Sequence, residues 1–497
     1  MSLNKRSAKF PDFAALCNKS LIYVWHHTFS LNIPNFTTKV CIMKNIVLIF
    51  ICLIITSSLI AQNGFTNLFD GKDLNGWKRA VGTGEYTVEN NTIVGTTVAG
   101  SPNTFLTTDK EYGDFILEFD AKVDDTASNS GVQIRSHFNP DEINGKNKGR
   151  VYGYQIEEDP SARKWSAGIY EEGRRGWLYP VTLNPSAQNL FKVGEWNHYK
   201  IEAIGNSIKT WLNDKPVAYL IDSVSHNGFI ALQVHAVPDP SLAGKKMYWK
   251  NVRIKTTGLT STPFPKDVFV VNMIPNNLSE AEKEDGWKLL FDGTTSDGWR
   301  GAFKTAFPDH GWKIDSGAIT VLEANGEQGK NGGDVVTTKE YSAFDLTFQF
   351  KLTPGANSGV KYFVTLKEKS DSSAIGLEYQ ILDDNLHPDA KLGRNGDRTL
   401  SSLYDLIPAN KNERYFNPVG QWNWGRIIVY PNNHVEHWLN GIKVLEYERG
   451  SKEFEDLVAI SKYKIWDHFG EAKEGHILLQ DHGNEVSYRS IKIKELK

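Results

Sequence analysis

The stretch FILEFDAKV at residues 115–123 alternates apolar with polar side chains, and this period of two is typical of a strand with one buried face. DLTFQFKL at residues 345–352 repeats the pattern. Turns rich in Gly, Asn and Asp separate such runs, and no long stretch has a convincing period of 3.6. Many short strands with turns between them predict an all-β antiparallel sandwich of the jelly-roll type.

These two stretches belong to a repeat that covers most of the chain. FTNLFDGKDLNGW at residues 65–77 returns as WKLLFDGTTSDGW at residues 287–299. Four shorter motifs recur in the same order: NSGV at 129–132 and 357–360, WN at 196–197 and 422–423, WLN at 211–213 and 438–440, and Gln-x-His at 233–235 and 480–482. The period of roughly 200 residues is too long for a solenoid. Each copy is therefore predicted to be a whole jelly-roll domain.

The N-terminal part of the chain has the pattern of a secretory signal. Lys44 precedes an unbroken apolar run at 46–55, and small residues lead to Ala61, after which we expect cleavage. The run is too short to span a bilayer, so we expect export to the periplasm, outer surface or medium with no stable membrane span; a membrane anchor is the alternative. The predicted organisation is a mis-annotated extension (1–42), a signal peptide (43–61), the first domain (62–255), a linker with a short helix capped by Ser279 (256–285) and the second domain (286–497).

Composition narrows the function classes. Hydrophobic residues make up 40% and charged residues 23%, as in an ordinary globular protein. The net charge of -3 gives no basic footprint for nucleic acid. The three cysteines are Cys17, Cys41 and Cys52, all before the repeat, so the repeated part has no disulfide, thiolate metal site or cysteine nucleophile.

An acid beside an amide recurs on one strand face in both copies. Glu378 and Gln380 are two residues apart in GLEYQI, so their side chains share a face of the predicted strand. The first copy has Gln155 and Glu157 there, with acid and amide exchanged. The alternative is a polar strand that merely faces water.

A second cluster follows a later strand. Gln480 and His482 share a face, with Asp481 between them, and Gln233 and His235 are their counterparts. A histidine that titrates near neutrality is a natural proton acceptor or donor. A histidine with a purely structural role is the alternative.

Other residues are weaker candidates, each with a structural reading beside the functional one. Lys361 follows the NSG motif, where the first copy has Gln133 and then Arg135. Further predicted binding residues are Asp383, Tyr404 with its counterpart Tyr170, and Trp438 as a sugar platform, while His387, Arg394 and Arg398 lie in a long loop. No GxSxG, HExxH, P-loop or Rossmann motif is present in the sequence.

The ordered set LFDG…GW, NSG, GLEYQI, WN, HWLNG and GHILLQDHG resembles the 3-keto-disaccharide hydrolase family. The resemblance covers residues 286–497 closely and residues 65–255 with departures. It implies a concanavalin A-like lectin/glucanase fold. It also implies activity on glycosides that are already oxidised at sugar carbon 3, which a separate sugar 3-oxidoreductase would have to supply.

The implied chemistry is an elimination. A ketone at C3 acidifies the C2 proton, a base removes it, and the C1 substituent leaves; addition of water completes a net hydrolysis. The assigned base is Glu378 or His482, and Lys361, Gln380, Gln480 or a bound divalent cation would stabilise the enolate. No cofactor is otherwise implied, and metal ligands remain unassigned.

The first copy departs from this pattern. Gln155 replaces the acid of Glu378, and Val234 replaces Asp481, while Arg135, Arg174, Arg175 and Trp177 are gained. Two alternatives to the keto-glycoside enzyme stay open for the chain: a carbohydrate-binding tandem without catalysis, and a conventional glycoside hydrolase with paired carboxylates.

Overall fold

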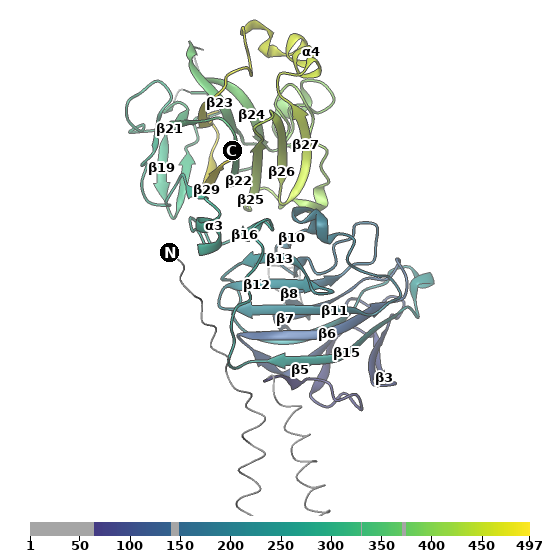
Figure 1. The fold of residues 1–497 in the computed structure, drawn as a ribbon. Helices are drawn as coiled ribbons and strands as arrows, with labels where there is room; N and C mark the ends of the chain where they lie inside the picture. Colours follow the sequence, from purple (N-terminus) through teal and green to yellow (C-terminus); the bar gives the residue numbers. More distant parts are fainter. Residues whose placement is uncertain (1–63, 141–148, 330, 370–373) are drawn as a thin grey trace, which may run out of the picture. The chain divides into compact units, whose positions relative to one another are not determined.

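The computed structural model describes residues 64–140, 149–329, 331–369 and 374–497 (Figure 1). The predicted upstream extension and signal peptide lie outside the described residues. Within the described ranges, no helix has the length and apolar character that crossing a membrane would require.

The first copy folds into two antiparallel sheets (Figure 1). Its nine-stranded sheet has the order β16 (Val270–Asn272), β13 (Lys215–Ile221), β12 (Ser207–Leu212), β11 (Asn197–Ile204), β6 (Phe115–Val123), β15 (Lys246–Lys255), β4 (Thr92–Thr96) and β3 (Glu85–Glu89), with β1 (Thr66–Asn67) also paired to β15. Its seven-stranded sheet has the order β10 (Gly176–Tyr179), β9 (Ile169–Glu172), β8 (Arg150–Glu158), β7 (Ser130–Asn139), β14 (Gly228–Val234), β5 (Thr104–Tyr112) and β2 (Trp77–Val81). Among the named strands of the described residues, the linker strand β16 alone pairs in parallel, with β13.

The second copy also folds into two sheets, each with fewer strands than its counterpart in the first copy. Its eight-stranded sheet has the order β19 (Trp312–Asp315), β20 (Ala318–Val321), β29 (Val486–Glu495), β22 (Phe344–Leu352), β25 (Asn423–Val429), β26 (His434–Leu439) and β27 (Ile442–Glu448), with β17 (Lys288–Leu289) also paired to β29. Its five-stranded sheet has the order β18 (Trp299–Gly301), β21 (Val335–Tyr341), β28 (Gly475–Leu479), β23 (Asn357–Lys369) and β24 (Ala374–Leu382). The predicted all-β sandwich fold is confirmed.

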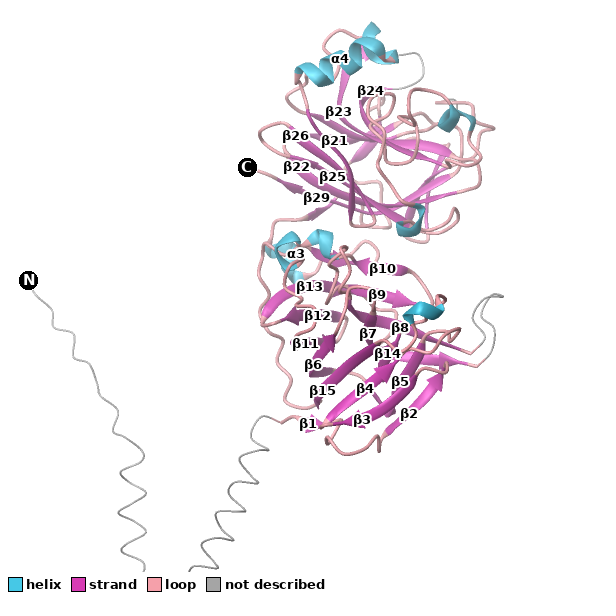
Figure 2. Ribbon diagram, turned by 90° about the vertical axis from the view of Figure 1, so that its right-hand side faces the viewer, coloured by secondary structure: helices cyan, strands magenta, loops and turns pink. Residues whose placement is uncertain are grey.

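Helices are few (Figure 2). The predicted linker helix is α3 (Glu280–Glu284), and Ser279 and Glu282 form its capping box as expected. The sequence analysis missed α4 (Lys452–Ile460), which Ser451 caps at its first turn. Short 3₁₀ turns lie at Val181–Leu183, Pro185–Ala187, Pro240–Leu242, Pro388–Lys391, Glu413–Tyr415 and Lys462–Ile465.

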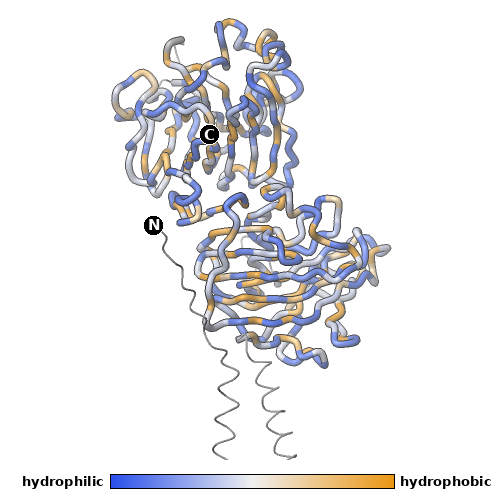
Figure 3. The backbone as a smooth tube through the Cα atoms, viewed as in Figure 1, coloured by the Kyte–Doolittle hydropathy of each residue, from blue (hydrophilic) through white to orange (hydrophobic). Residues whose placement is uncertain are grey.

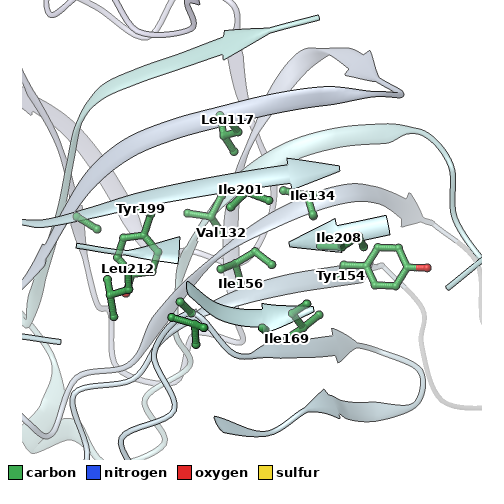
Figure 4. Close-up of a cluster of buried hydrophobic side chains, with 14 of the residues drawn as sticks. Leu117, Val132, Ile134, Tyr154, Ile156, Ile169, Tyr199, Ile201, Ile208 and Leu212 are labelled. Carbon is green, nitrogen blue, oxygen red and sulfur yellow. The ribbon is translucent and has the colours of Figure 1, made fainter. Parts of the chain in front are cut away.

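The core of the first copy lies between its two sheets. Figure 3 shows hydrophobic and hydrophilic residues alternating along the strands, as the period of two predicts. Leu117 and Phe119 of β6 face inward, while Glu118 and Asp120, which alternate with them, are partly exposed. Figure 4 shows how side chains of both sheets interdigitate: Leu117, Val132, Ile134, Tyr154, Ile156, Ile169, Tyr199, Ile201, Ile208 and Leu212.

The repeated motifs fix the same local geometry in each copy. Trp77 Nε1 donates to Leu68 O at 2.7 Å, and Trp299 Nε1 donates to Leu290 O at 2.6 Å. This bond explains the spacing of the LFDG…GW motif, because the indole ties the start of the motif to its end. In the same way, the side chain of Asn440 donates through Nδ2 to Asn423 Oδ1 at 2.7 Å, which joins the WLN motif to the WN motif.

Candidate functional site

The candidate site of the second copy is built from two rows of residues on the outer face of the five-stranded sheet. Lys361 of β23 lies directly opposite Glu378 of β24. In the next row on this face, Gly359 lies opposite Gln380, and its carbonyl accepts from the backbone N–H of Gln480, which follows β28. Strands β28, β23 and β24 thus bring together residues that are more than 100 positions apart in the sequence (Figure 1). We call Lys361, Glu378, Gln380, Gln480 and His482 the second-copy site.

The NSG motif makes this arrangement possible. A Cβ atom at Gly359 would collide with Glu378 Oε1, so only glycine lets the carboxylate lie across β23. Ser358 Oγ donates to Gln480 O at 2.7 Å and fixes the residue that follows β28. The first copy has the same devices: Ser130 Oγ donates to Gln233 O at 2.7 Å, and a Cβ atom at Gly131 would lie 2.7 Å from Gln155 Cγ.

Several buried polar atoms of the second-copy site have no protein partner. Glu378 is 4% exposed, yet within the described residues its carboxylate makes no hydrogen bond or ion pair. Gln380 Oε1, Gln480 Oε1 and His482 Nδ1 are also buried without a hydrogen-bond partner there. Leaving buried polar atoms unpaired costs free energy, and a group of them on one face indicates a ligand position.

Other carboxylates of the second copy already accept hydrogen bonds from backbone N–H groups. Asp334 Oδ1 accepts from the backbone N–H of Asp481 at 2.8 Å, and burial raises the pKa of Asp334 to about 6. The carboxylate of Asp481 itself accepts from Gly333 N and Gly483 N. Asp383 accepts from three backbone N–H groups, those of Gly355, Asn385 and Leu386. Asp481 and Asp383, both predicted to bind substrate, thus also organise loops, because aspartate readily caps such turns.

His482 is held neutral over most of the pH range. Burial above all, with the nearby His387 as a second cause, lowers the pKa of His482 to about 4. The two imidazole rings lie 5.8 Å apart, centroid to centroid, in an edge-on arrangement. A neutral imidazole with an unpartnered nitrogen can accept a proton or a hydrogen bond from a substrate.

A network of loop residues borders the site. Tyr404 N donates to Glu378 O at 3.0 Å, and Tyr404 Oη donates to Asp389 Oδ2 at 2.8 Å. Arg398 pairs with both Asp389 and Asp405. The predicted residue Tyr404 thus lies beside Glu378, held in place by acids that the sequence analysis did not single out.

The sequence analysis also missed Lys462. It lies in the segment 449–474, which joins β27 to β28 and contains α4, whereas the first copy joins β13 to β14 through residues 222–227 alone. Lys462 Nζ lies 4.1 Å from the centroid of the Tyr404 ring. Its pKa is lowered, chiefly by loss of hydration; the charge of Glu378 opposes this shift and that of Lys361 adds to it. Comparison of the two repeats could have revealed the inserted segment as a feature of the second copy alone.

Two predicted binding residues lie elsewhere. Trp438 belongs to β26 of the eight-stranded sheet, where its Nε1 donates to Glu436 Oε2 at 2.8 Å, so it is not part of the second-copy site. Arg135 has no exposed surface, and its guanidinium donates to Gly113 O, Gly205 O and Asp114 Oδ1. Both side chains are occupied by structural contacts, which corrects the prediction that they bind substrate.

The equivalent face of the first copy carries amides in place of the charged pair. Gln133 lies opposite Gln155, as Lys361 lies opposite Glu378, and Gln133 Nε2 donates to Gln155 Oε1 at 2.7 Å. Gln155 Nε2 in turn lies 3.3 Å from Glu157 and from Gln233 Oε1. Burial raises the pKa of Glu157 to about 8. We call Gln133, Gln155, Glu157 and Gln233 the first-copy site.

A cavity of about 470 Å³ lies over the first-copy site. Tyr170 lies opposite Gln155 on β9 and lines this cavity, as does His235, which is exposed. The predicted residues Gln155, Glu157, Gln233, Tyr170 and His235 are therefore brought together, and Arg135 is not among them.

The described residues contain one group of three histidine or acidic side chains close enough to share a metal ion. His434, Glu436 and Glu446 have ligand atoms within 4.8 Å of one another, but they lie on β26 and β27 of the eight-stranded sheet. Lys443 Nζ already bridges the two carboxylates, at 3.1 Å from Glu436 and 2.7 Å from Glu446. This group is separate from the candidate site.

The chain is similar to several known proteins. The chain is 36% identical over 233 residues to the 3-keto-disaccharide hydrolase of Bacteroides thetaiotaomicron, a match that covers 43% of this chain and 79% of that protein. A solved structure of a candidate glycosyl hydrolase from Parabacteroides distasonis is 29% identical, with 45% of this chain and 100% of that chain covered and a TM-score of 0.39. A carbohydrate-binding module of Bacillus subtilis is 20% identical, with coverage of 36% and 94% and a TM-score of 0.25.

The family model of the 3-keto-alpha-glucoside-1,2-lyase-like domain matches residues 64–255 and again residues 286–494. The two matches span most of the chain and correspond to the two repeats. They confirm the family that the sequence motifs indicated. The chain belongs to the 3-keto-alpha-glucoside-1,2-lyase-like domain family, with two copies of the domain.

Proposed function

We propose that the second copy cleaves the glycosidic bond of 3-keto-glycosides, such as 3-keto-disaccharides, by eliminating the C1 substituent and adding water. The observation that carries this proposal is the cross-strand pair of Lys361 and Glu378 on an outer sheet face where buried polar atoms lack partners. Family membership and the 36% identical 3-keto-disaccharide hydrolase support the same substrate class.

The pair suits enolate chemistry because the reacting atoms of the sugar are neighbours. The C2 proton and the C3 carbonyl oxygen lie on adjacent carbons, so a base and an oxyanion stabiliser must also lie side by side. Side chains directly opposite each other on antiparallel strands have Cβ atoms roughly 5 Å apart. Glu378 is assigned as the base, since its carboxylate has no partner to displace. Lys361 is assigned as the enolate stabiliser.

The reaction then balances as follows. Glu378 takes the C2 proton, and the C2–H electron pair forms the enolate, whose oxygen accepts a hydrogen bond from the Lys361 ammonium. The enolate re-forms the C3 ketone as a C1–C2 double bond forms, and the bond from C1 to the leaving oxygen breaks; that oxygen takes the proton held by Glu378, which returns to its carboxylate form. Water then adds its hydroxyl to C1 and a proton to C2, and the products are two sugars.

The other residues of the second-copy site would hold the sugar and the water. The unpartnered oxygens of Gln380 and Gln480 can accept from sugar hydroxyls, and neutral His482 can accept a proton from the water that adds to C1. The same oxygen and imidazole donors suit a divalent cation, which would supply further electrophilic stabilisation of the enolate. A conventional paired-carboxylate mechanism has less support, because Asp334, Asp383 and Asp481 use their oxygens for backbone N–H groups.

The proposal also covers where the chain acts and which reaction supplies its substrate. The signal-like segment at residues 43–61 supports export of the mature chain. A 3-keto substrate also requires an upstream enzyme that oxidises the C3 hydroxyl of the sugar.

The test is a cleavage assay on the full chain with a 3-keto-disaccharide of glucose and its unoxidised parent, with and without chelator. We expect release of sugar from the keto compound alone. In D₂O, elimination and hydration place solvent deuterium at C2 of the 3-keto product, whereas direct hydrolysis at C1 does not. Product incubated alone in D₂O measures any spontaneous exchange. Loss of activity with chelator would add the cation as a second electrophile.

The matched variants are Glu378→Gln and Glu436→Gln. Both remove one buried carboxylate, but Glu436 lies on the eight-stranded sheet. Loss of a positioned base costs about 10²- to 10⁴-fold in rate, so we expect that fall in kcat for Glu378→Gln only. Cleavage of the parent disaccharide by the wild-type chain would instead favour a conventional glycosidase.

A further inference from the structure

The first-copy site has lost the groups that the elimination needs. Gln133 and Gln155 occupy the places of Lys361 and Glu378, and they are hydrogen-bonded to each other at 2.7 Å. A primary amide is neither a base nor a cation near neutral pH. The face therefore lacks the proton acceptor and the charged enolate stabiliser at these two positions, and the acid that it keeps, Glu157, is largely protonated because burial raises its pKa to about 8.

The site nevertheless keeps an unpaired group at its floor. Gln233 has no exposed surface, and its Nε2 has no hydrogen-bond partner within the described residues. Buried amide groups without partners are rare in folded proteins. Because Gln233 lines the cavity of about 470 Å³, its free N–H groups indicate a ligand that supplies an acceptor oxygen.

The charge of the cavity indicates a neutral ligand. Arg163 is paired with Asp159 at 2.7 Å, and Arg150 is paired with Glu172. Burial keeps Glu157 largely protonated at neutral pH, because its pKa is raised to about 8. Arg414 also lines the cavity, but it is exposed to solvent, which screens its charge. At the buried floor an anionic ligand would need an uncompensated cation and a cationic ligand an ionised carboxylate, so the amides and the neutral acid are better suited to hydroxyl groups.

The walls of the cavity are suited to a sugar ring. Tyr170 and Trp177 both line it, with ring centroids 5.4 Å apart. Aromatic rings pack against the apolar C–H faces of a ligand, while Gln155, Glu157 and Gln233 offer donors and acceptors for its hydroxyls.

We propose that the first-copy site is a separate binding site for a neutral carbohydrate, which it holds without cleaving. The choice of a sugar over another neutral polyol rests on the proposed function of the second copy. The existence of a non-cleaving site rests on the first copy alone.

The experiment uses the full chain carrying Glu378→Gln, with the unoxidised glucose disaccharide as probe. We expect this chain to bind the disaccharide by calorimetry but to release no sugar from the disaccharide or from its 3-keto form. Adding Gln233→Leu should weaken one class of binding site at least tenfold. The matched change Gln480→Leu, at the equivalent position of the second copy, should leave that class in place. Tyr170→Ala, at the cavity wall rather than in the buried floor, provides a second variant, and thermal melting checks that each chain is folded.

Two results would overturn the proposal. One is an isotherm that Gln233→Leu and Tyr170→Ala both leave unaltered in folded protein. The other is turnover by the Glu378→Gln chain that Glu157→Gln then removes, because the first copy would then be a second catalytic site. A wild-type chain that fails to cleave the keto compound, but binds the disaccharide through Gln233, would support this inference while refuting the proposed function.

Discussion

Lys361 lies directly opposite Glu378 across strands β23 and β24, yet its ammonium donates to the carbonyl oxygen of Ala374, at 3.1 Å, and not to the carboxylate. An ion pair between the two would neutralise both groups and occupy the atoms that a substrate has to reach. The observed arrangement leaves the carboxylate unpaired, and the Lys361 ammonium lies toward Ala374, four residues before Glu378 on β24. This separation within a cross-strand pair is the feature that favours proton abstraction over simple sugar binding.

Replacing Lys361 by methionine tests its role as the enolate stabiliser. Methionine keeps much of the apolar stem but removes the charge and the donor. Loss of one oxyanion donor costs about 10²- to 10³-fold in kcat, so we expect a fall of that size with a smaller change in KM. Steady-state kinetics on the 3-keto-disaccharide measure both. Lys443→Met removes a lysine of the eight-stranded sheet as a control, and an equal fall in both variants would contradict the assignment.

The pKa of His482, lowered to about 4, predicts how this residue titrates. The imidazole should stay neutral from pH 8 down to about 5 and gain a proton only near pH 4. The unfolded chain binds that proton near pH 6.5, so this group makes the fold less stable as pH falls from 6.5 toward 4. Histidine NMR spectra of the wild type and of His482→Gln identify the resonance among 13 histidines. A midpoint at or above 6.5 would show that the ring is solvated.

The repeat made much of the site predictable from the sequence. The period of two placed Glu378 with Gln380, and Gln480 with His482, on shared strand faces. The structure adds the reason for the NSG motif: Gly359 gives Glu378 room, and Ser358 holds Gln480. The sequence therefore grouped these residues strand by strand, and the structure shows that Lys361, Glu378 and Gln380 lie in neighbouring rows of one sheet.

The positions of the residues that the sequence placed wrongly depend on tertiary features of the fold. Arg135 follows Ile134 on β7, and simple alternation would turn it to the outer face; a β-bulge there gives it a φ of 46° and buries it. The same bulge position in the second copy holds Phe363, with a φ of 52°. Alternation also cannot say which sheet a strand joins, which is why Trp438 was placed at a sugar site. Lys462 comes from a segment with no counterpart in the first copy; comparing the repeats reveals the insertion but not which of its residues reaches the site.

The raised pKa of Glu157 predicts that the stability of the first copy depends on pH. Its pKa is raised to about 8 by burial, whereas the unfolded side chain loses its proton near 4.5. The unfolded state is therefore favoured as pH rises from 4.5 to 8, by up to about 1.4 kcal/mol for each pH unit. Glu157→Gln, which cannot ionise, should become steadily more stable relative to the wild type over this window. Urea unfolding at several pH values gives the difference, and a constant difference would show that Glu157 is ionised throughout.

Replacing Lys462 tests whether the inserted segment 449–474 contributes a substrate contact to the second-copy site. Its ammonium lies over the ring of Tyr404, whose backbone is bonded to Glu378, so it adds a cation at the edge of the proposed substrate position. We expect Lys462→Met to lower kcat/KM for the 3-keto-disaccharide by about tenfold, or about 1.4 kcal/mol of transition-state binding. The loss should appear mainly in KM, because the residue would contact the sugar without taking part in proton transfer.

Lys464→Met is the matched control for this variant. Lys464 lies in the same 3₁₀ turn, Lys462–Ile465, and its residue is exposed. If both methionine variants lower kcat/KM equally, the segment acts through its general charge or its folding, and Lys462 has no specific contact. If only Lys462→Met does so, the insertion distinguishes the second copy as the one equipped for turnover, since residues 222–227 of the first copy supply no lysine at that place.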